Sequence, residues 1–311
     1  MQTQKILKKD FKKYLVLKNL KNLSDCPLSI YALGNLKLLE LETVTIVGSR
    51  KISSYGEQVI KEIVPILAQN GICVVSGVAY GCDYFAQKSA VDSGGTTIGI
   101  IGCGINKITT HQHYLFIKHC LDKNVGLFLS EFEPDMQAAK WTFIKRDRIM
   151  ACLGDKLVVI EAAQKSGTMH TVNFALELGK EVYAVPGNIY NSNSIGTNIL
   201  IQNGANVLLS AQDLLQDYSV NDTNKSNQPF SKTETAILHV LDDEKTALEV
   251  SRLTDISVAN VLSDLTVLEM KGIIKQVGGK WSSLCRSAIR QLAEEDVKPN
   301  FRTPQALQRF T

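Results

Sequence analysis

Two short apolar runs between Val44 and Val78 each end in a turn of small residues. The first run, Val44–Val47, leads into Gly48, Ser49 and Arg50, and an amphipathic stretch follows before the second run. Strand, small-residue turn and helix in this order are typical of a parallel α/β unit. Backbone N–H groups in such a turn, beside a helix N-terminus, can bind an anion, and Arg50 adds a positive charge. This turn predicts a phosphate or nucleic-acid backbone site, with a plain connecting turn as the alternative.

Apolar runs and helical-period segments alternate from Leu41 to Gln216. The expected strands are Val44–Val47, Ile72–Val75, Thr97–Ile101, Gly126–Leu129, Leu157–Ile160, Val182–Val185 and Asn206–Leu209. The expected helices are Tyr55–Gln69, Asp83–Asp92, His111–Lys123, Thr142–Leu153, Met169–Leu178 and Asn198–Gln202, with Pro65 expected to kink or shorten the first. Continuous apolar strands separated by helices predict an α/β fold with a doubly wound, mainly parallel sheet.

Composition shifts divide the chain into five segments. Residues 1–42 hold eight Lys against four acidic residues, and seven of these Lys precede Leu23. This pattern predicts a basic helix, whose lysines either form a solvated face or make an auxiliary contact to phosphates. Residues 43–218 carry the sheet, and the Asn- and Ser-rich residues 219–230 read as a linker. Residues 231–282 predict three helices and a hairpin, a winged-helix-like module, and residues 283–311 a short helix and polar tail.

The overall composition excludes several classes of protein. The chain has no run of 18 apolar residues and no secretory signal pattern at its start. Its seven cysteines lack CxxC spacing, which favours reduced thiols and a cytoplasmic location. A net charge of only +3 means that any anion site must be a local cluster of basic groups.

The only dense basic cluster of the central domain is Lys145, Arg146 and Arg148. Two aromatic residues, Trp141 and Phe143, lie beside it, as stacking platforms do in proteins that bind single strands. A solvated helix face, with the aromatics in the core, is the alternative interpretation.

A second candidate phosphate site is Lys165, Ser166, Gly167 and Thr168, which follows a predicted strand and precedes a helix. The carboxyl ends of parallel strands meet at one edge of the sheet. We therefore expect Arg50, the basic cluster and Lys165–Thr168 to line one pocket.

Other polar residues have simpler explanations. Asp83 is placed to cap a helix, and Glu161 directly after a strand is best explained as a hydrogen-bonded carboxylate. His111, His113 and His119 with Cys120 fit a polar helix face better than a metal site. No cofactor motif is present, so neither a metal nor a cofactor is predicted.

Several ordered motifs resemble the DNA-processing protein A family (DprA, also called Smf). They are IVGSR at 46–50, VVSGVAYGCD at 74–83, LSE at 129–131, F-x-x-R-x-R at 143–148, IEAAQKSGT at 160–168, AVPGN at 184–188 and GTNILIQNGANVL at 196–208. Two differences stand out: Asp147 replaces the usual Asn between the two Arg, and the N-terminal segment is too short for the SAM-like domain of many members.

The resemblance implies an extended Rossmann-like domain that binds single-stranded DNA during natural transformation. It also implies a homodimer that protects incoming DNA and helps to load the RecA recombinase, with no catalytic activity. By motif, Arg50, Arg146 and Arg148 would contact phosphates, with Lys165 and Ser166–Thr168 in support. Asp147 could pair with a flanking Arg and weaken phosphate binding.

Two other functions fit parts of the pattern. The first is a nucleotide phosphoribohydrolase of the lysine-decarboxylase-like (LOG) kind, but Thr171 stands where its catalytic Glu is expected. The second is a winged-helix transcription regulator. Residues 231–282 hold six basic against eight acidic residues, which disfavours a DNA-reading module and favours a protein partner or a regulatory role.

Overall fold

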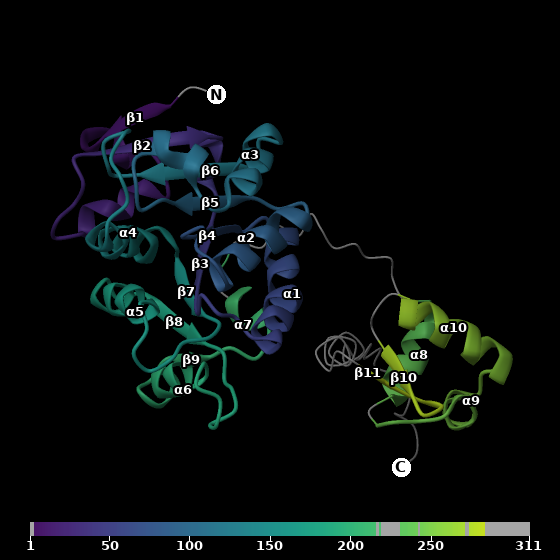
Figure 1. Cartoon of the computed structure of the whole chain (residues 1–311). Helices are drawn as coiled ribbons and strands as arrows, with labels where there is room; N and C mark the ends of the chain where they lie inside the picture. Colours follow the sequence, from purple (N-terminus) through teal and green to yellow (C-terminus); the bar gives the residue numbers. More distant parts are fainter. Residues whose placement is uncertain (1–2, 216–217, 219–230, 242, 271–273, 284–311) are drawn as a thin grey trace, which may run out of the picture. The chain divides into compact units, whose positions relative to one another are not determined.

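The computed structural model describes residues 3–215, 218, 231–241, 243–270 and 274–283. The chain forms two compact units, which divide between Asn224 and Lys225. Figure 1 shows a large sheet with helices on both faces in the first unit, and helices with a hairpin in the second. The predicted linker at 219–230 and the tail at 284–311 lie outside the described residues.

The first unit contains a nine-stranded sheet in the order β1-β2-β6-β5-β4-β3-β7-β8-β9. From β6 to β9 in this row the strands pair in parallel, and β1 and β2 add antiparallel beside β6. The strands are β1 (Gln4–Leu7), β2 (Ser29–Gly34), β3 (Thr43–Val47), β4 (Cys73–Ser76), β5 (Thr97–Ile100), β6 (Gly126–Ser130), β7 (Lys156–Val159), β8 (Glu181–Ala184) and β9 (Asn206–Val207). The predicted doubly wound, mainly parallel fold is confirmed.

The strand order reverses between β3 and β7. The chain runs outward from β3 through β4 and β5 to β6, then returns to β7 beside β3 and runs the other way. At such a reversal the loops after the two strands diverge, which leaves a crevice at their carboxyl ends where α/β proteins bind ligands. The turn after β3 begins at Gly48 and the turn after β7 precedes Thr168, so both predicted phosphate turns flank this crevice.

Helices cover both faces of the sheet, with α4 and α5 on one face and α1 and α2 on the other (Figure 1). Side chains of successive strand residues point to opposite faces, so Val47 and Val75 pack in one core and Ile46 and Val74 in the other. The helices are α1 (Ser54–Gln69), α2 (Cys82–Asp92), α3 (Tyr114–Asp122), α4 (Lys140–Leu153), α5 (Thr168–Glu177), α6 (Ile195–Gln202) and α7 (Gln212–Leu215).

Three predicted helix features differ from the structure. Helix α1 continues through Pro65 to Gln69, so Pro65 does not shorten it. Helix α3 begins at Tyr114, because the preceding residues form the 3₁₀ helix η4 (Ile105–Thr110) and a turn. Asp83 does not cap α2: the N-cap is Gly81, whose φ of 75° suits glycine, and Asp83 lies inside the helix.

The N-terminal segment is not the basic helix that its lysines predict. It forms β1, the 3₁₀ helices η1 (Lys8–Lys13) and η2 (Leu17–Asn22), then β2 and the 3₁₀ helix η3 (Leu36–Glu40). Phe11, Leu17 and Leu20 are fully buried in one core of the sheet. The apolar positions therefore decide the structure of this segment, and its lysines remain exposed around them.

The second unit has the predicted order of three helices and a hairpin. The elements are α8 (Lys232–Val240), α9 (Ala247–Thr254), α10 (Val258–Met270), β10 (Ile274–Val277) and β11 (Lys280–Ser283). Trp281 and Leu265 belong to a separate buried cluster of this unit. Among the described helices of either unit, none is both long and apolar enough to cross a membrane.

Candidate nucleic-acid interface

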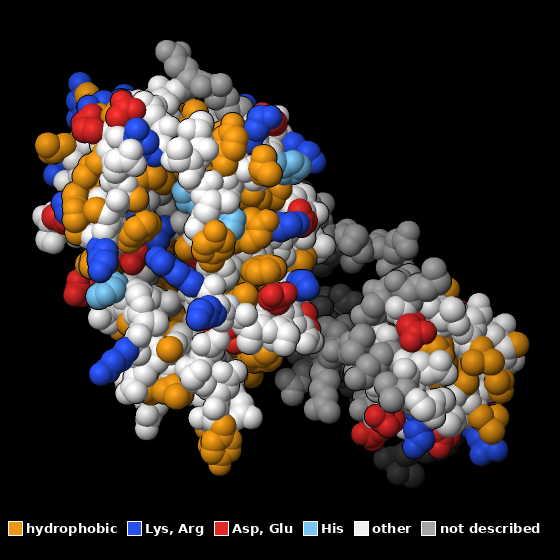
Figure 2. Space-filling model, viewed as in Figure 1, with side chains coloured by type: hydrophobic (Ala, Val, Ile, Leu, Met, Phe, Trp, Pro, Cys, Tyr) orange, Lys and Arg blue, Asp and Glu red, His pale blue; other side chains and the backbone are white. Residues whose placement is uncertain are grey.

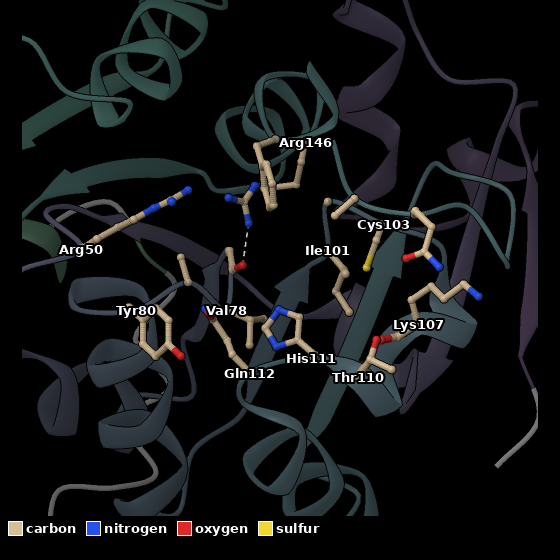
Figure 3. Close-up of a pocket in the computed structure, with 16 residues that line it drawn as sticks. Arg50, Val78, Tyr80, Ile101, Cys103, Lys107, Thr110, His111, Gln112 and Arg146 are labelled. Atoms are coloured by element: carbon tan, nitrogen blue, oxygen red, sulfur yellow. Dashed lines mark hydrogen bonds between the residues drawn. The ribbon is translucent and has the colours of Figure 1, made fainter. Parts of the chain in front are cut away.

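Two adjoining cavities open along the carboxyl ends of the central strands, and we call them together the edge groove. The first, about 300 Å³, lies over β4 and β5 and is lined by residues 77–80, 101–103, 110–112 and Lys107 (Figure 3). The second, about 370 Å³, lies over β3 and β7 and is lined by residues 47–50 and 166–168. Arg50, Ala79, Phe143 and Arg146 line both cavities, so the two lie side by side along these residues.

The turn after β3 is fixed by its neighbours. A Cβ at Gly48 would lie 2.5 Å from Cys82 Sγ, so only glycine fits. The Ser49 N–H donates to the Glu161 carbonyl at 2.8 Å, and the Ser49 carbonyl accepts from the Cys82 N–H at 3.1 Å. The Ser49 amide is therefore not free for an anion, and the exposed Arg50 side chain is the group that this turn presents.

The turn after β4 is held in an unusual conformation against the first turn. Val78 has a φ of 54° although it is fully buried, and Gly81 has a φ of 75°. A Cβ at Gly81 would lie 2.2 Å from the Ser49 carbonyl oxygen. Asp83 accepts a hydrogen bond from the Gly77 N–H at 3.1 Å, which explains why this carboxylate is buried. Asp83 shapes the turn rather than capping its helix.

Helix α4 presents Phe143, Arg146, Asp147 and Met150 to the edge groove. Their spacing places them on one face of a helix. Arg146 is only 5% exposed; its Nη1 donates to the carbonyls of Gly77 at 2.5 Å and Ile100 at 3.0 Å. Figure 3 shows the first of these bonds. Arg146 thus ties α4 to the ends of β4 and β5, while part of its guanidinium lines the cavities.

Two buried carboxylates lie beside this guanidinium. Asp147 accepts from Arg146 Nε at 2.9 Å, which confirms the pairing expected from the sequence. Burial raises the pKa of Asp83 to about 6, against the opposing effect of Arg146. Burial also raises the pKa of Asp147, and Arg146 again opposes the shift. One positive and two acidic groups therefore form the floor of the groove.

Phe143 forms an aromatic wall between two cations. Its ring centroid is 5.8 Å from the Arg50 guanidinium carbon and 5.9 Å from that of Arg146. A Cβ at Gly102 would lie 2.8 Å from the ring, so Gly102 makes room for it. The ring is 37% exposed, which leaves part of it available to a ligand in the groove.

The turn before α5 closes the second cavity. Ser166, Gly167 and Thr168 line it, and Gly167 is the N-cap of α5. Ser166 Oγ is buried and has no hydrogen-bond partner among the described residues. The Met169 and His170 N–H groups already donate to the Ser166 and Gly167 carbonyls. The turn can therefore offer an anion the Ser166 hydroxyl and the partial positive charge of the helix N-terminus.

The remaining predicted residues lie elsewhere. Arg148 has a side chain that is 4% exposed, with its Nε 3.1 Å from Asp25 and its Nη2 against Glu131. Lys145 and Lys165 are exposed, and neither lines the edge groove. The structure therefore brings together seven of the ten predicted residues: Gly48, Ser49, Arg50, Arg146, Ser166, Gly167 and Thr168.

Glu161 is the hydrogen-bonded strand-end carboxylate that the sequence predicts. It accepts from the Ser53 N–H at 2.9 Å and from the Ser53 hydroxyl. Ser53 in turn accepts from the Gly56 N–H as the N-cap of α1. Glu161 therefore fixes the start of α1 behind the Arg50 turn.

Sequence reasoning missed one group of groove residues. Tyr80, Lys107, His111 and Gln112 line the first cavity, and burial lowers the pKa of His111 to about 4, so its ring is neutral at pH 7. His113 stacks on Tyr84 with centroids 4.2 Å apart and supports this wall. Tyr80 follows the second parallel strand, β4, and the other three follow the third, β5; these positions are the signal that could have placed them at the edge.

Comparisons with known proteins agree with this geometry. The sequence model of the family described as DNA recombination-mediator protein A matches residues 6–219. DNA processing protein DprA of Streptococcus pneumoniae is 36% identical over 205 residues, which cover 64% of this chain and 70% of that protein. DprA of Bacillus subtilis is 33% identical over 199 residues, covering 64% of this chain and 66% of the relative, just under two thirds of its length.

A solved structure of a DNA processing protein A also matches this chain. The structure of DNA processing protein A from Helicobacter pylori, which concerns the single-stranded DNA binding mode of that protein, has a TM-score of 0.61 and 30% identity. The match covers 70% of this chain and 98% of that one. The chain belongs to the DNA recombination-mediator protein A family.

Proposed function

We propose that this protein binds single-stranded DNA in the edge groove and acts in natural transformation. Its role there is to protect incoming DNA and to help load the RecA recombinase. The observation that carries the proposal is that Arg50, Arg146 and the turn before α5 meet around one aromatic ring, Phe143. Membership of the family and the single-stranded DNA binding described for the Helicobacter pylori protein support it.

Phosphates would bind chiefly to Arg50 and to the turn Ser166–Thr168. Arg50 is exposed and makes no ion pair with any described residue, so its guanidinium can form a bidentate contact with a phosphate. The buried Ser166 hydroxyl and the partial positive charge at the start of α5 supply a second contact. Such contacts depend on salt and not on base sequence.

Selection for single strands would come from the groove wall. Phe143 offers a partly exposed ring on the wall that the two cavities share. An unpaired base can turn its face towards such a ring, whereas a base inside a duplex is already stacked. The neutral side chains of His111 and Gln112 can donate hydrogen bonds to base edges or accept hydrogen bonds from them, without adding charge.

Three basic residues take other roles in this proposal. Arg148 serves as a structural ion pair, because its side chain is buried against Glu131. Lys145 and Lys165 act as outer contacts to phosphates beyond the groove.

The wider role rests on the family. We propose a homodimer, since one groove holds few nucleotides and a second groove adds avidity. The second unit serves as a winged-helix-like module for a protein partner, given its acidic balance. The protein acts in the cytoplasm and by binding alone, without a cofactor and without chemical change to the DNA.

The test is a titration of labelled single- and double-stranded oligonucleotides at several salt concentrations, with a nuclease and nucleotide-hydrolysis assay alongside. Single strands should bind more tightly, with affinity that falls as salt rises. Arg50→Ala should lower affinity by about tenfold and flatten the salt dependence, whereas Lys61→Ala on the outer surface of α1 should change neither. Equal affinity for duplex, or an Arg50→Ala variant with unchanged affinity, would contradict the proposal.

A further inference from the structure

The exposed side of helix α4 carries large apolar side chains that the edge groove does not use. Trp141 is 50% exposed and Ile144 is 43% exposed, although both lie in the first two turns of the helix. Neither lines a cavity of the groove. Lys140 and Lys145 are exposed beside them, and Lys145 Nζ lies 5.9 Å from the Trp141 ring centroid.

These side chains form a band that starts at the groove wall. Residues on a helix advance by about 100° each, so Lys140 and Ile144 fall between Phe143 and Trp141 around the axis. Phe143 belongs to the groove, and Trp141 lies at the far end of the band with Lys145. The exposed band is confined to the first two turns of α4, because Asp147 and Arg148, which fall in the same angular range further along the helix, are buried.

The indole is held in place while part of it stays open to solvent. The Phe132 ring meets the Trp141 ring at 84° with centroids 5.7 Å apart. Thr142 anchors this turn, since its hydroxyl donates to the Gly102 carbonyl at 2.6 Å. A ring fixed in this way loses little conformational entropy when a flat ligand stacks on it.

The chemistry of the band favours a polyanion with flat groups over an apolar partner. An exposed aromatic beside a lysine is the combination that single-strand binders use, with the ring for a base and the cation for a phosphate. Neither Lys140 nor Lys145 makes an ion pair with a described residue, so both charges are available.

We propose that Trp141 is a stacking platform for a base of the single strand that leaves the edge groove, with Lys140 and Lys145 contacting its phosphates. The inference rests on the proposed function and extends the nucleic-acid track around α4. Because Trp141 lies outside the lining of both cavities, it matters only for strands long enough to extend beyond the groove.

Two measurements test this. The first titrates wild type and Trp141→Ala with oligothymidylates of increasing length. Short oligomers should bind both proteins equally, and beyond a threshold length the variant should bind at least about fivefold more weakly, the lower end of base–aromatic stacking. Leu176→Ala, which removes an exposed apolar side chain at the far end of α5, is the control and should match wild type at every length.

The second measurement is tryptophan fluorescence, because the chain has only two Trp. A long oligothymidylate should quench the emission of wild type and of Trp281→Phe, but not that of Trp141→Phe. If all these proteins bind the oligomers and neither affinity nor fluorescence depends on Trp141, the platform is refuted while the groove stands. Failure of wild type to bind any oligomer refutes the proposed function itself and, with it, the platform.

Discussion

The two sides of helix α4 use the same residue types for different purposes. On the groove side, Arg146 holds the ends of two strands and lines both cavities. On the other side, Arg148 is buried in an ion pair with Glu131 and Asp25. The two arginines are two positions apart, which on a helix places them on different sides. A basic cluster in a sequence is therefore not one site, because the helix divides its charges.

The largest loss of stability and of binding is expected when Arg146 is removed from the groove side of α4. Arg146→Ala leaves the Gly77 and Ile100 carbonyls without their donor and two buried carboxylates without their cation. Removing one partner of a buried charge cluster costs about 3–5 kcal/mol. Urea unfolding at pH 7 should show this loss, and single-strand binding should disappear as well. A variant as stable as wild type would show that Arg146 does not hold the strand ends.

The matched change on the other side is Arg148→Ala. Glu131 loses its partner, although burial already raises the pKa of Glu131, so this carboxyl can take up a proton and limit the cost. We expect a loss of about 3 kcal/mol, the lower end for a broken buried pair. The affinity of the folded variant for single strands should equal that of wild type. A specific loss of affinity without loss of stability would place Arg148 in the interface after all.

The sequence predicted the sheet better than the roles of individual side chains. Strands such as Val44–Val47 were recognisable because apolar runs report burial directly, and the meeting of Arg50 with Ser166–Thr168 follows from topology. The fate of Arg148 depends on Asp25 and Glu131, which are distant in sequence. Glu131 follows a predicted strand, but nothing local shows that it pairs with Arg148, and Asp25 lies in the N-terminal segment whose structure was not predicted. The 3₁₀ helices of the N-terminal segment were missed because six residues are too few for a clear periodicity.

Acid titration should separate Asp83 from ordinary surface carboxylates. The pKa of Asp83 in the folded protein is about 6, above the ordinary value of 3.8. Between these two pH values the carboxyl group is protonated in the folded state but ionised in the unfolded state. Asp83 therefore favours folding at low pH, and this contribution is lost as pH rises towards 6. A shift of about two units corresponds to at most about 3 kcal/mol.

The comparison to make is between wild type and Asp83→Asn, whose side chain cannot ionise. The variant should gain stability relative to wild type as pH rises from about 4 to about 6, in urea unfolding at each pH. If the difference in unfolding free energy between the variant and wild type does not change with pH, Asp83 titrates in the ordinary range.

The smallest expected effect, and the sharpest for the groove, is that of Asp147→Asn. The Asn oxygen can still accept from Arg146 Nε, so the bond at 2.9 Å can persist while the negative charge beside the groove is removed. Phosphates should then bind a few-fold more tightly, by about 1 kcal/mol, and less so at high salt because the repulsion is screened. Asp135→Asn, a change of the same charge at an exposed loop outside the groove lining, is the control. If both variants and wild type bind single strands with equal affinity at low salt, the Asp147 charge does not influence the bound phosphates. The Arg146 guanidinium and the two buried carboxylates would then determine the shape of the groove but not its affinity.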